Sequence, residues 1–223
     1  MKVFFAEVAG DAPAEDWPPM SPEKRARILR MRHKKDAQAA LTAHRLLCYA
    51  LKRTYGIEPE AEDWGAGQNG KPYLKNANDI HFNISHSGRI AMCAVNDGPV
   101  GVDVEMVRPF SDSIIRRIMS AEEKEALASA QDRNRLFFKI WTLKEAYLKF
   151  TGFGISALDS ITVYPTKDGI VTNAKGCEFA SIDGILGYEA AVCAQTAEFT
   201  LERVTEELWA DMNAKKNFVS NIG

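Results

Sequence analysis

Apolar residues recur along two long stretches of the chain at the spacing of an α-helix. In residues 35–54 and in residues 133–150 they fall at i, i+4, i+7 and i+11, which places them on one helix face. The predicted buried faces consist of Ala40, His44, Leu47 and Leu51 in the first stretch and of Leu136, Ile140, Leu143 and Tyr147 in the second. The pattern therefore predicts two long amphipathic helices that each cover a core.

Shorter segments have the pattern of strands. In the run Val100-Gly101-Val102-Asp103-Val104-Glu105 the valines take every second position, so a strand over residues 100–107 buries them and directs both carboxylates to the opposite face. Further strands are predicted at residues 2–8, 80–84, 90–95, 161–164, 177–182, 189–195 and 200–204. Ser21 and Ser120, each followed by glutamates, predict the starts of two more helices.

The order of these elements repeats along the chain. The similar segments that begin at Ser21 and Ser120 lie 99 residues apart, and Ala91-Met92-Cys93-Ala94-Val95 recurs as Ala191-Val192-Cys193-Ala194-Gln195. We therefore predict an α+β fold of two pseudo-twofold α/β subdomains. The N-terminal half-domain comprises residues 1–99 and the C-terminal half-domain residues 100–223.

The segment Asn96-Asp97-Gly98-Pro99 has the composition of a hairpin turn. Antiparallel pairing across it places Asp103 opposite Met92 and Glu105 opposite Ile90. A loop formed by Ser85-His86-Ser87-Gly88-Arg89 would then lie beside the Glu105 end of the strand.

Composition narrows the class of protein. The 223 residues carry a net charge of −2, which argues against nucleic-acid binding, because that needs a broad basic surface. One basic stripe stands out between residues 24 and 35, and it could hold a polyanionic small molecule; its members are Lys24, Arg25, Arg27, Arg30, Arg32, Lys34 and Lys35.

The apolar runs and the cysteines bear on the cellular location of the protein. No apolar run approaches the roughly 20 residues of a membrane-spanning helix, and an acid at Glu7 interrupts any signal-peptide core. Cys48, Cys93, Cys177 and Cys193 have no CxxC spacing, so we expect reduced, buried thiols. A cytoplasmic protein without membrane contact is predicted.

Candidate chemistry gathers on the strand at residues 100–107 and on the second long helix. Asp103 and Glu105 supply carboxylates, and Glu145 and Lys149 share one helix face with Trp141. Such oxygen ligands suit Mg²⁺, which fills its other positions with water and substrate phosphates. Taken singly, each feature also fits a solvated strand face, a helix ion pair or a core tryptophan. Their combination favours a magnesium and pyrophosphate site.

The segment Phe82-Asn83-Ile84-Ser85-His86-Ser87 holds the remaining polar motif. A serine hydrolase is rejected because neither serine lies in a Gly-x-Ser-x-Gly elbow. Anion binding and a capped polar loop both remain open. His33, His44 and His81 fit no metal spacing and are expected to be structural or solvated.

The order of four blocks in the sequence resembles the 4′-phosphopantetheinyl transferases of the surfactin-synthetase-activating type. The blocks are Gly70-Lys71-Pro72, Phe82-Asn83-Ile84-Ser85-His86-Ser87, Gly101-Val102-Asp103-Val104-Glu105 and Trp141-x-x-Lys144-Glu145-Ala146-x-x-Lys149, and the likeness spans residues 21–154. It implies that the chain transfers 4′-phosphopantetheine from coenzyme A to a serine of an apo acyl or peptidyl carrier protein. Mg²⁺ would be the cofactor and adenosine 3′,5′-bisphosphate the second product.

The same resemblance implies roles for individual residues. Asp103, Glu105 and Glu145 would hold the metal. Lys144 and Lys149 would lie near the phosphates, with Lys149 better suited to stabilise the leaving group. Coenzyme A would also be bound through the 3′-phosphate by Lys24, Arg27, Ser85 and His86, and through the nucleotide portion by Lys71. The general base would be Glu145, or Glu123 acting through a metal-bound water, and we favour Glu145.

The partner surface and the assembly state are further expectations. Phe110, Ile114, Ile115, Ile118 and Met119, with Arg116 and Arg117, either form a docking surface for an acidic carrier or join the second core. Two fused half-domains with the active site at their interface make a monomer reasonable. The pathway stays open among peptide synthetase, polyketide, fatty acid and lysine carriers. A metal-dependent phosphodiesterase and a non-catalytic coenzyme A binding module are the competing functions.

Overall fold

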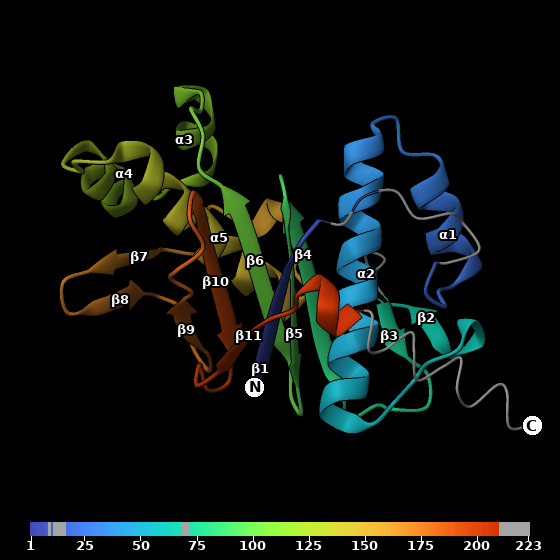
Figure 1. Cartoon of the computed structure of the whole chain (residues 1–223). Coiled ribbons are helices and arrows are strands. Elements are labelled where there is room, and N and C mark those ends of the chain that lie inside the picture. The colour runs from blue at the N-terminus through green and yellow to red at the C-terminus, as the bar shows by residue number, and fades with distance from the viewer. Residues whose placement is uncertain (9, 11–16, 68–71, 210–223) are drawn as a thin grey trace, which may run out of the picture.

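The computed structural model describes residues 1–8, 10, 17–67 and 72–209, and shows a duplicated α+β fold (Figure 1). Its helices are α1 (Pro22–Leu29), α2 (Lys34–Tyr55), α3 (Asp112–Ile118), α4 (Ala121–Ala128) and α5 (Arg133–Thr151), with 3-10 turns η2 (Ala61–Asp63) and η4 (Ile155–Ala157). Its strands are β1 (Lys2–Glu7), β2 (Trp64–Ala66), β3 (Pro72–Leu74), β4 (His81–Ser87), β5 (Ile90–Asn96), β6 (Val100–Met106), β7 (Val163–Thr166), β8 (Gly169–Thr172), β9 (Glu178–Ser181), β10 (Tyr188–Ala194) and β11 (Thr200–Arg203).

Two main sheets form the centre of the molecule. One has the strand order β11-β1-β5-β4 and the other the order β6-β10-β9, while β2 pairs with β3 and β7 with β8. In each main sheet the first strand of the half pairs antiparallel with a later strand, β1 with β5 and β6 with β10. The short helices α1 and α4 and the long helices α2 and α5 repeat in the same order. The predicted duplicated α+β fold is therefore confirmed.

The two long helices end and pack as the apolar pattern predicts. Gly56 and Gly152 stop α2 and α5 in the left-handed conformation, with φ of 71° and 79°. Helix α2 covers the four-stranded sheet with Leu46, Leu47 and Leu51, which are fully buried. Helix α5 lies against β6 and β10 in the second half (Figure 1). Each helix thus gives its sheet a core.

The predicted hairpin between β5 and β6 was wrong. Strand β5 already pairs with β1 on one edge and β4 on the other, so neither edge is left for β6. The chain instead crosses to the second sheet at the Asn96 to Pro99 turn, and β6 pairs with β10. Asp103 consequently lies opposite Ala191, and Glu105 opposite Glu189.

The loop predicted at Ser85 to Ser87 is in fact the end of β4, and this strand lies alongside β6 of the other sheet. Side chains bridge the two strands. Asn83 Oδ1 accepts a hydrogen bond from the backbone N–H of Val102 at 3.0 Å, and Ser87 Oγ accepts one from that of Met106 at 3.1 Å. We call this line of contact between β4 and β6 the seam.

The C-terminal part of the second half returns to the first sheet. Strand β11 runs parallel to β1, and Val204 and Trp209 are buried in the core beneath α2. The division of the chain at residues 99 and 100 stays a prediction. Sequence patterns did not reveal α3, β2, β3 or β8, because these short elements have too few residues for a periodicity.

Other sequence-based expectations have mixed outcomes. The cysteines are free, and Cys93 and Cys193 are buried whereas Cys48 and Cys177 are half-buried. In the parts of the chain that the structure describes, we find no helix with the length and apolar character needed to cross a bilayer.

Gly101 permits the close approach of β6 to α5, and Gly101→Ala is expected to destabilise the protein. An added Cβ would collide with the carbonyl oxygen of Ala146 and would lie 2.6 Å from the backbone nitrogen of Phe150. Since both are backbone atoms, the helix must shift as a whole, at a cost of about 1–3 kcal/mol or more. Urea unfolding measures the loss. Gly98→Ala is the control, because its Cβ meets nothing nearer than 3.5 Å; equal stability of the two variants would contradict the prediction.

Candidate active site

Asp103 and Lys149 form the centre of a polar cluster at the seam. Asp103 is only 4% exposed, and its Oδ1 accepts hydrogen bonds from Lys149 Nζ and from Ser85 Oγ, both at 2.7 Å. Lys149 Nζ also donates to the carbonyl oxygen of Val102 at 3.0 Å. Residues from β4, β6 and α5 therefore meet at one point, and both halves of the duplication contribute.

Glu145 lies one helical turn before Lys149 and faces the same cluster. Burial raises the pKa of Glu145, and the negative charge of Asp103 raises it further while Lys149 opposes both effects. Burial likewise raises the pKa of Asp103, against the lowering effect of Lys149 and of the hydrogen bond from Ser85. The two carboxylates thus hold excess negative charge that a cation would relieve.

Two carboxylate oxygens in this cluster lack a hydrogen-bond partner among the described residues. They are Asp103 Oδ2 and Glu145 Oε1, and both are buried. Buried polar atoms are normally satisfied, so two orphaned acceptors beside a lysine mark a place for an additional charged group. Hard oxygen donors of this kind fit Mg²⁺.

Glu105 is engaged elsewhere in the structure. Its Oε2 accepts hydrogen bonds from Ser87 Oγ at 2.7 Å and from Arg108 Nη1 at 3.2 Å. Within the described ranges no group of three histidine, cysteine, aspartate or glutamate side chains is already arranged to hold a metal ion. Asp103 and Glu145 therefore each offer a metal an oxygen without a hydrogen-bond partner, whereas Glu105 already uses its Oε2 for two hydrogen bonds.

His86 is on β4 between the basic N-terminal helix and the cluster. Partial burial of the ring lowers the pKa of His86, and the positive charges of Lys149 and Lys24 lower it further, opposed by Asp36 and Glu105. The imidazole is thus within electrostatic reach of Lys24 on α1 and of Lys149 on α5. Cations from both halves of the duplication therefore act on His86.

Lys24 and Arg27 line a pocket of about 230 Å³ beside Trp64 and Ile84. Burial lowers the pKa of Lys24 to about 8, and the neighbouring charge of Arg27 also lowers it. Two cations held this close favour an anionic ligand. Lys71, the other residue predicted to contact the nucleotide, lies outside the described residues.

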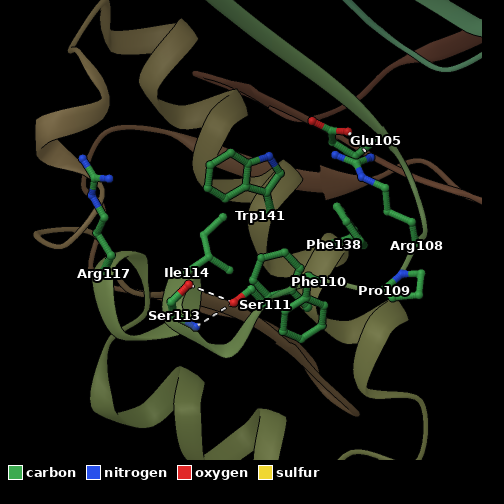
Figure 2. A pocket seen from close by; sticks show the side chains of 11 residues that line it. Glu105, Arg108, Pro109, Phe110, Ser111, Ser113, Ile114, Arg117, Phe138 and Trp141 are labelled. Atoms are coloured by element: carbon green, nitrogen blue, oxygen red, sulfur yellow. Dashed lines mark hydrogen bonds and ion pairs between the residues drawn. The ribbon is translucent and has the colours of Figure 1, made fainter.

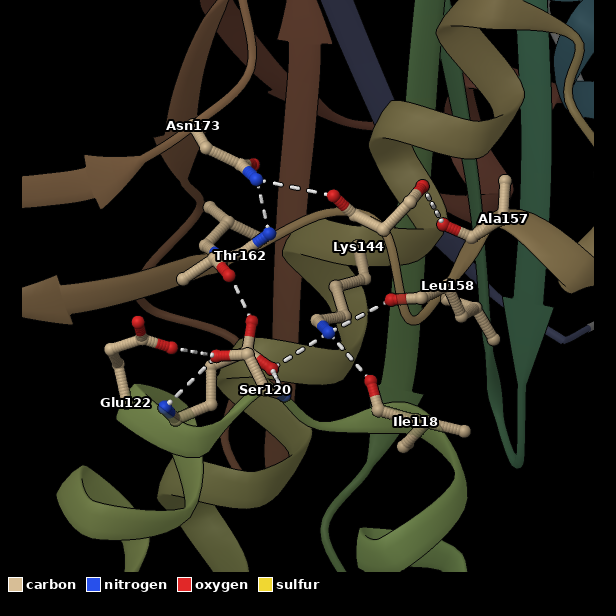
Figure 3. Close-up of polar contacts among 11 residues, drawn as sticks. Ile118, Ser120, Glu122, Lys144, Ala157, Leu158, Thr162 and Asn173 are labelled. Carbon is tan, nitrogen blue, oxygen red and sulfur yellow. Dashed lines mark hydrogen bonds and ion pairs between the residues drawn. The ribbon is translucent and has the colours of Figure 1, made fainter.

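Lys144 and Glu123, two further predicted site residues, pair with each other inside the second half. Both side chains are fully buried, and Lys144 Nζ donates to Glu123 Oε2 at 2.7 Å and to the carbonyl oxygens of Ile118 and Leu158 (Figure 3). Glu123 also accepts hydrogen bonds from the backbone N–H groups of Ser120 and Val163, both at 2.8 Å. The pair is fully partnered inside the second half, so it has no free group for phosphate or water.

A larger pocket of about 580 Å³ opens beside the cluster. Glu105 and Arg108 lie at one end, Arg117 lies at the other, and Trp141 projects between them (Figure 2). Aromatic rings wall it, with Phe110 stacked on Phe137 at a centroid distance of 3.9 Å. Trp141 is therefore both part of the second core and a wall of this pocket, which the sequence left as alternatives.

Sequence reasoning missed several residues of the site. Ser87 and Arg108 bind Glu105, and Asn83 ties β4 to β6. Asn83, Ser85 and Ser87 occupy alternate positions of one strand, so their side chains point to the same face. This alternation was a sequence signal that could have identified Asn83 and Ser87. Arg108 carried no comparable signal.

Comparison with known proteins identifies the family. Two protein-family models match the sequence. The family described as 4′-phosphopantetheinyl transferase superfamily matches residues 99–196, and the family described as 4′-phosphopantetheinyl transferase, N-terminal, matches residues 18–97. A 4′-phosphopantetheinyl transferase of Bacillus subtilis is 35% identical over 188 residues, which cover 81% of this chain and 84% of that protein. The transferase psf-1 of Bacillus pumilus is 35% identical over 186 residues, 80% of each chain. HetI of Nostoc sp. is 40% identical over 116 residues, 48% of this chain and 49% of its own.

The fold and the cluster define a class of protein built from two α+β halves that share polar residues along a seam. Within that class, the chain belongs to the 4′-phosphopantetheinyl transferase superfamily and is a 4′-phosphopantetheinyl transferase.

Proposed function

We propose that the protein transfers 4′-phosphopantetheine from coenzyme A to a serine hydroxyl of an apo acyl or peptidyl carrier protein in a Mg²⁺-dependent reaction. The serine attacks the β-phosphate of the pyrophosphate, and adenosine 3′,5′-bisphosphate leaves. The observation that carries the proposal is the pair of orphaned carboxylate oxygens of Asp103 and Glu145 next to Lys149. Membership of the transferase family supports the same chemistry.

Asp103, Glu145 and Glu105 would hold Mg²⁺, which when bound supplies electrostatic stabilisation of the pyrophosphate. Lys149 would offset charge that develops on the leaving phosphate, since its ammonium already lies at the cluster. Glu145 is the better candidate for the group that accepts the serine proton, because both oxygens of Glu123 are occupied and its side chain is fully buried.

Lys24, Arg27 and His86, with Ser85, would bind the 3′-phosphate of coenzyme A. The pocket lined by Lys24 and Arg27 supports this placement, and Lys24 is one of the cations whose charge acts on His86. Lys71 stays a proposed nucleotide contact. The monomeric state, the cytoplasmic location and the absence of nucleic-acid and membrane partners also stay predictions.

Intact mass spectrometry on a panel of apo carrier proteins tests the function. Each carrier is incubated with the enzyme, coenzyme A and Mg²⁺, and with a chelator in the control. A metal-dependent mass gain of one phosphopantetheine is the expected result, and its rate ranks the carriers. Coenzyme A binding without any gain would favour a binding module. Release of adenosine 3′,5′-bisphosphate without a carrier would favour a phosphodiesterase.

Charge reversal on α3 is expected to weaken carrier binding. Ile115, Ile118 and Met119 are buried in the second core, whereas Arg116 and Arg117 are exposed and Arg117 lines the aromatic pocket. The double variant Arg116→Glu, Arg117→Glu should raise the KM for an acidic carrier about tenfold or more, because rim charges steer and orient such partners. The KM for coenzyme A should not change. Lys167→Glu, an exposed position on the β7–β8 turn, is the control; unchanged carrier kinetics in the double variant would remove the proposal.

A further inference from the structure

A buried histidine, His44, contacts Lys24, which lines the basic pocket. His44 on α2 is fully buried, and its Nδ1 lies 2.9 Å from the ammonium nitrogen of Lys24. Its other ring nitrogen, Nε2, lies 2.8 Å from the carbonyl oxygen of Pro19. The ring also packs against Trp64 at a centroid distance of 4.9 Å. His44 is therefore held by three neighbours from different parts of the first half.

These contacts fix the protonation of the ring. A carbonyl oxygen can only accept, so Nε2 carries the hydrogen, and an ammonium can only donate, so Nδ1 is the acceptor. Burial lowers the pKa of His44 to about 3, and the charge of Lys24 also lowers it. His44 is consequently a neutral acceptor for Lys24.

A neutral acceptor has a specific consequence for Lys24. A carboxylate partner would orient the ammonium and also cancel its charge, whereas an imidazole orients it and leaves the charge intact. Arg27, one helical turn further along α1, lines the same pocket, as does the exposed Glu23. The ammonium is thus held in one place with its charge available to an anion in the pocket.

We propose that His44 is a positioning residue that holds Lys24 for the 3′-phosphate of coenzyme A and so sets the preference for coenzyme A over its 3′-dephospho form. The inference rests on the proposed function, in which Lys24 contacts that phosphate. His44 itself does not touch the substrate. Its contribution is the fixed direction of the Lys24 ammonium.

Two substitutions of His44 test the proposal, because each keeps the hydrogen-bonding group of one ring nitrogen and removes that of the other. In His44→Asn the side-chain oxygen takes the place of Nδ1 and can still accept from Lys24. In His44→Gln the longer amide reaches the position of Nε2 and keeps the bond to Pro19 but not the acceptor for Lys24. Calorimetry gives the Kd of each variant for coenzyme A and for 3′-dephospho-coenzyme A, and steady-state kinetics give kcat.

We expect His44→Gln to weaken coenzyme A binding about tenfold, with the Kd for the dephospho form and the kcat at saturation within about twofold of the parent values. His44→Asn should stay within about threefold for both ligands. In a Lys24→Met background, which itself loses the preference, His44→Gln should add nothing further.

Three results would overturn the proposal. The first is that His44→Gln weakens the binding of both ligands equally, and the second is that it weakens the binding of neither. The third is that Lys24→Met keeps the preference for coenzyme A, a result that does not depend on how the His44 variants fold. If the parent protein transfers phosphopantetheine, either of the first two results removes only the role of His44, and the third also removes the proposed contact of Lys24 with the 3′-phosphate. If the parent protein transfers none, the proposed function fails instead.

Discussion

Glu145→Gln is expected to lower the transfer rate about a hundred- to ten-thousandfold while the protein stays folded. The substitution keeps the size of the side chain and removes the charge that is proposed to hold the metal and accept the serine proton. Because burial and Asp103 already disfavour the charged form of Glu145, a neutral amide should not lower the thermal midpoint. The rate of carrier mass gain at saturating Mg²⁺ is the measurement, and circular dichroism checks the fold.

The control for this experiment is Glu58→Gln. Glu58 is an exposed carboxylate that pairs with Lys52 at 2.8 Å, so the same chemical change is made away from the cluster. Near-normal turnover in Glu145→Gln, combined with loss of turnover in folded Glu123→Gln, would reverse the assignment of the base.

Glu123→Gln is expected to be the most destabilising single substitution of those considered, by about 3–5 kcal/mol. The carboxylate accepts from Lys144 and from two backbone N–H groups in a fully buried site. A glutamine has only one acceptor oxygen, and its NH₂ group would face a donor, so the ammonium of Lys144 would lose its counter-charge. Urea unfolding followed by circular dichroism measures the effect.

Glu122→Gln provides a matched control one residue earlier on α4. Glu122 is exposed and accepts a hydrogen bond from Ser120 Oγ at 2.8 Å, so the same change should alter the unfolding curve little. If the two variants unfold at the same urea concentration, the buried pair does not stabilise the second half.

The pair also connects α3, which carries the proposed docking surface, with α5, which carries the proposed catalytic residues. Lys144 on α5 donates to Ile118 at the end of α3 and to Leu158 beyond η4, while Glu123 caps the start of α4. The face of α5 that carries Lys144, next to Glu145, therefore joins α5 to the end of α3 and to the segment after η4. This arrangement explains how two adjacent residues, Lys144 and Glu145, can have different functions: successive residues of a helix point about 100° apart.

Local patterns predicted the helices well and the pairing of strands poorly. The period of apolar residues in α2 and α5 and the glycines that follow them depend only on near neighbours in the chain. Strand partners depend on which edges other segments have already taken. β6 was assigned to β5 because a turn joined them, but β1 and β4 occupy both edges of β5.

The sequence by itself determined the duplicated element order, the long amphipathic helices and the residue types of the cluster, because each is a matter of local spacing. Only the tertiary structure decided which of those residues meet. It brought Ser85, Asp103, Glu145 and Lys149 together at the seam and placed Lys144 with Glu123 in the core. It also turned His44 towards Lys24. Contacts between residues 18 to 46 positions apart depend on how two sheets and their helices pack, and no short pattern encodes that packing.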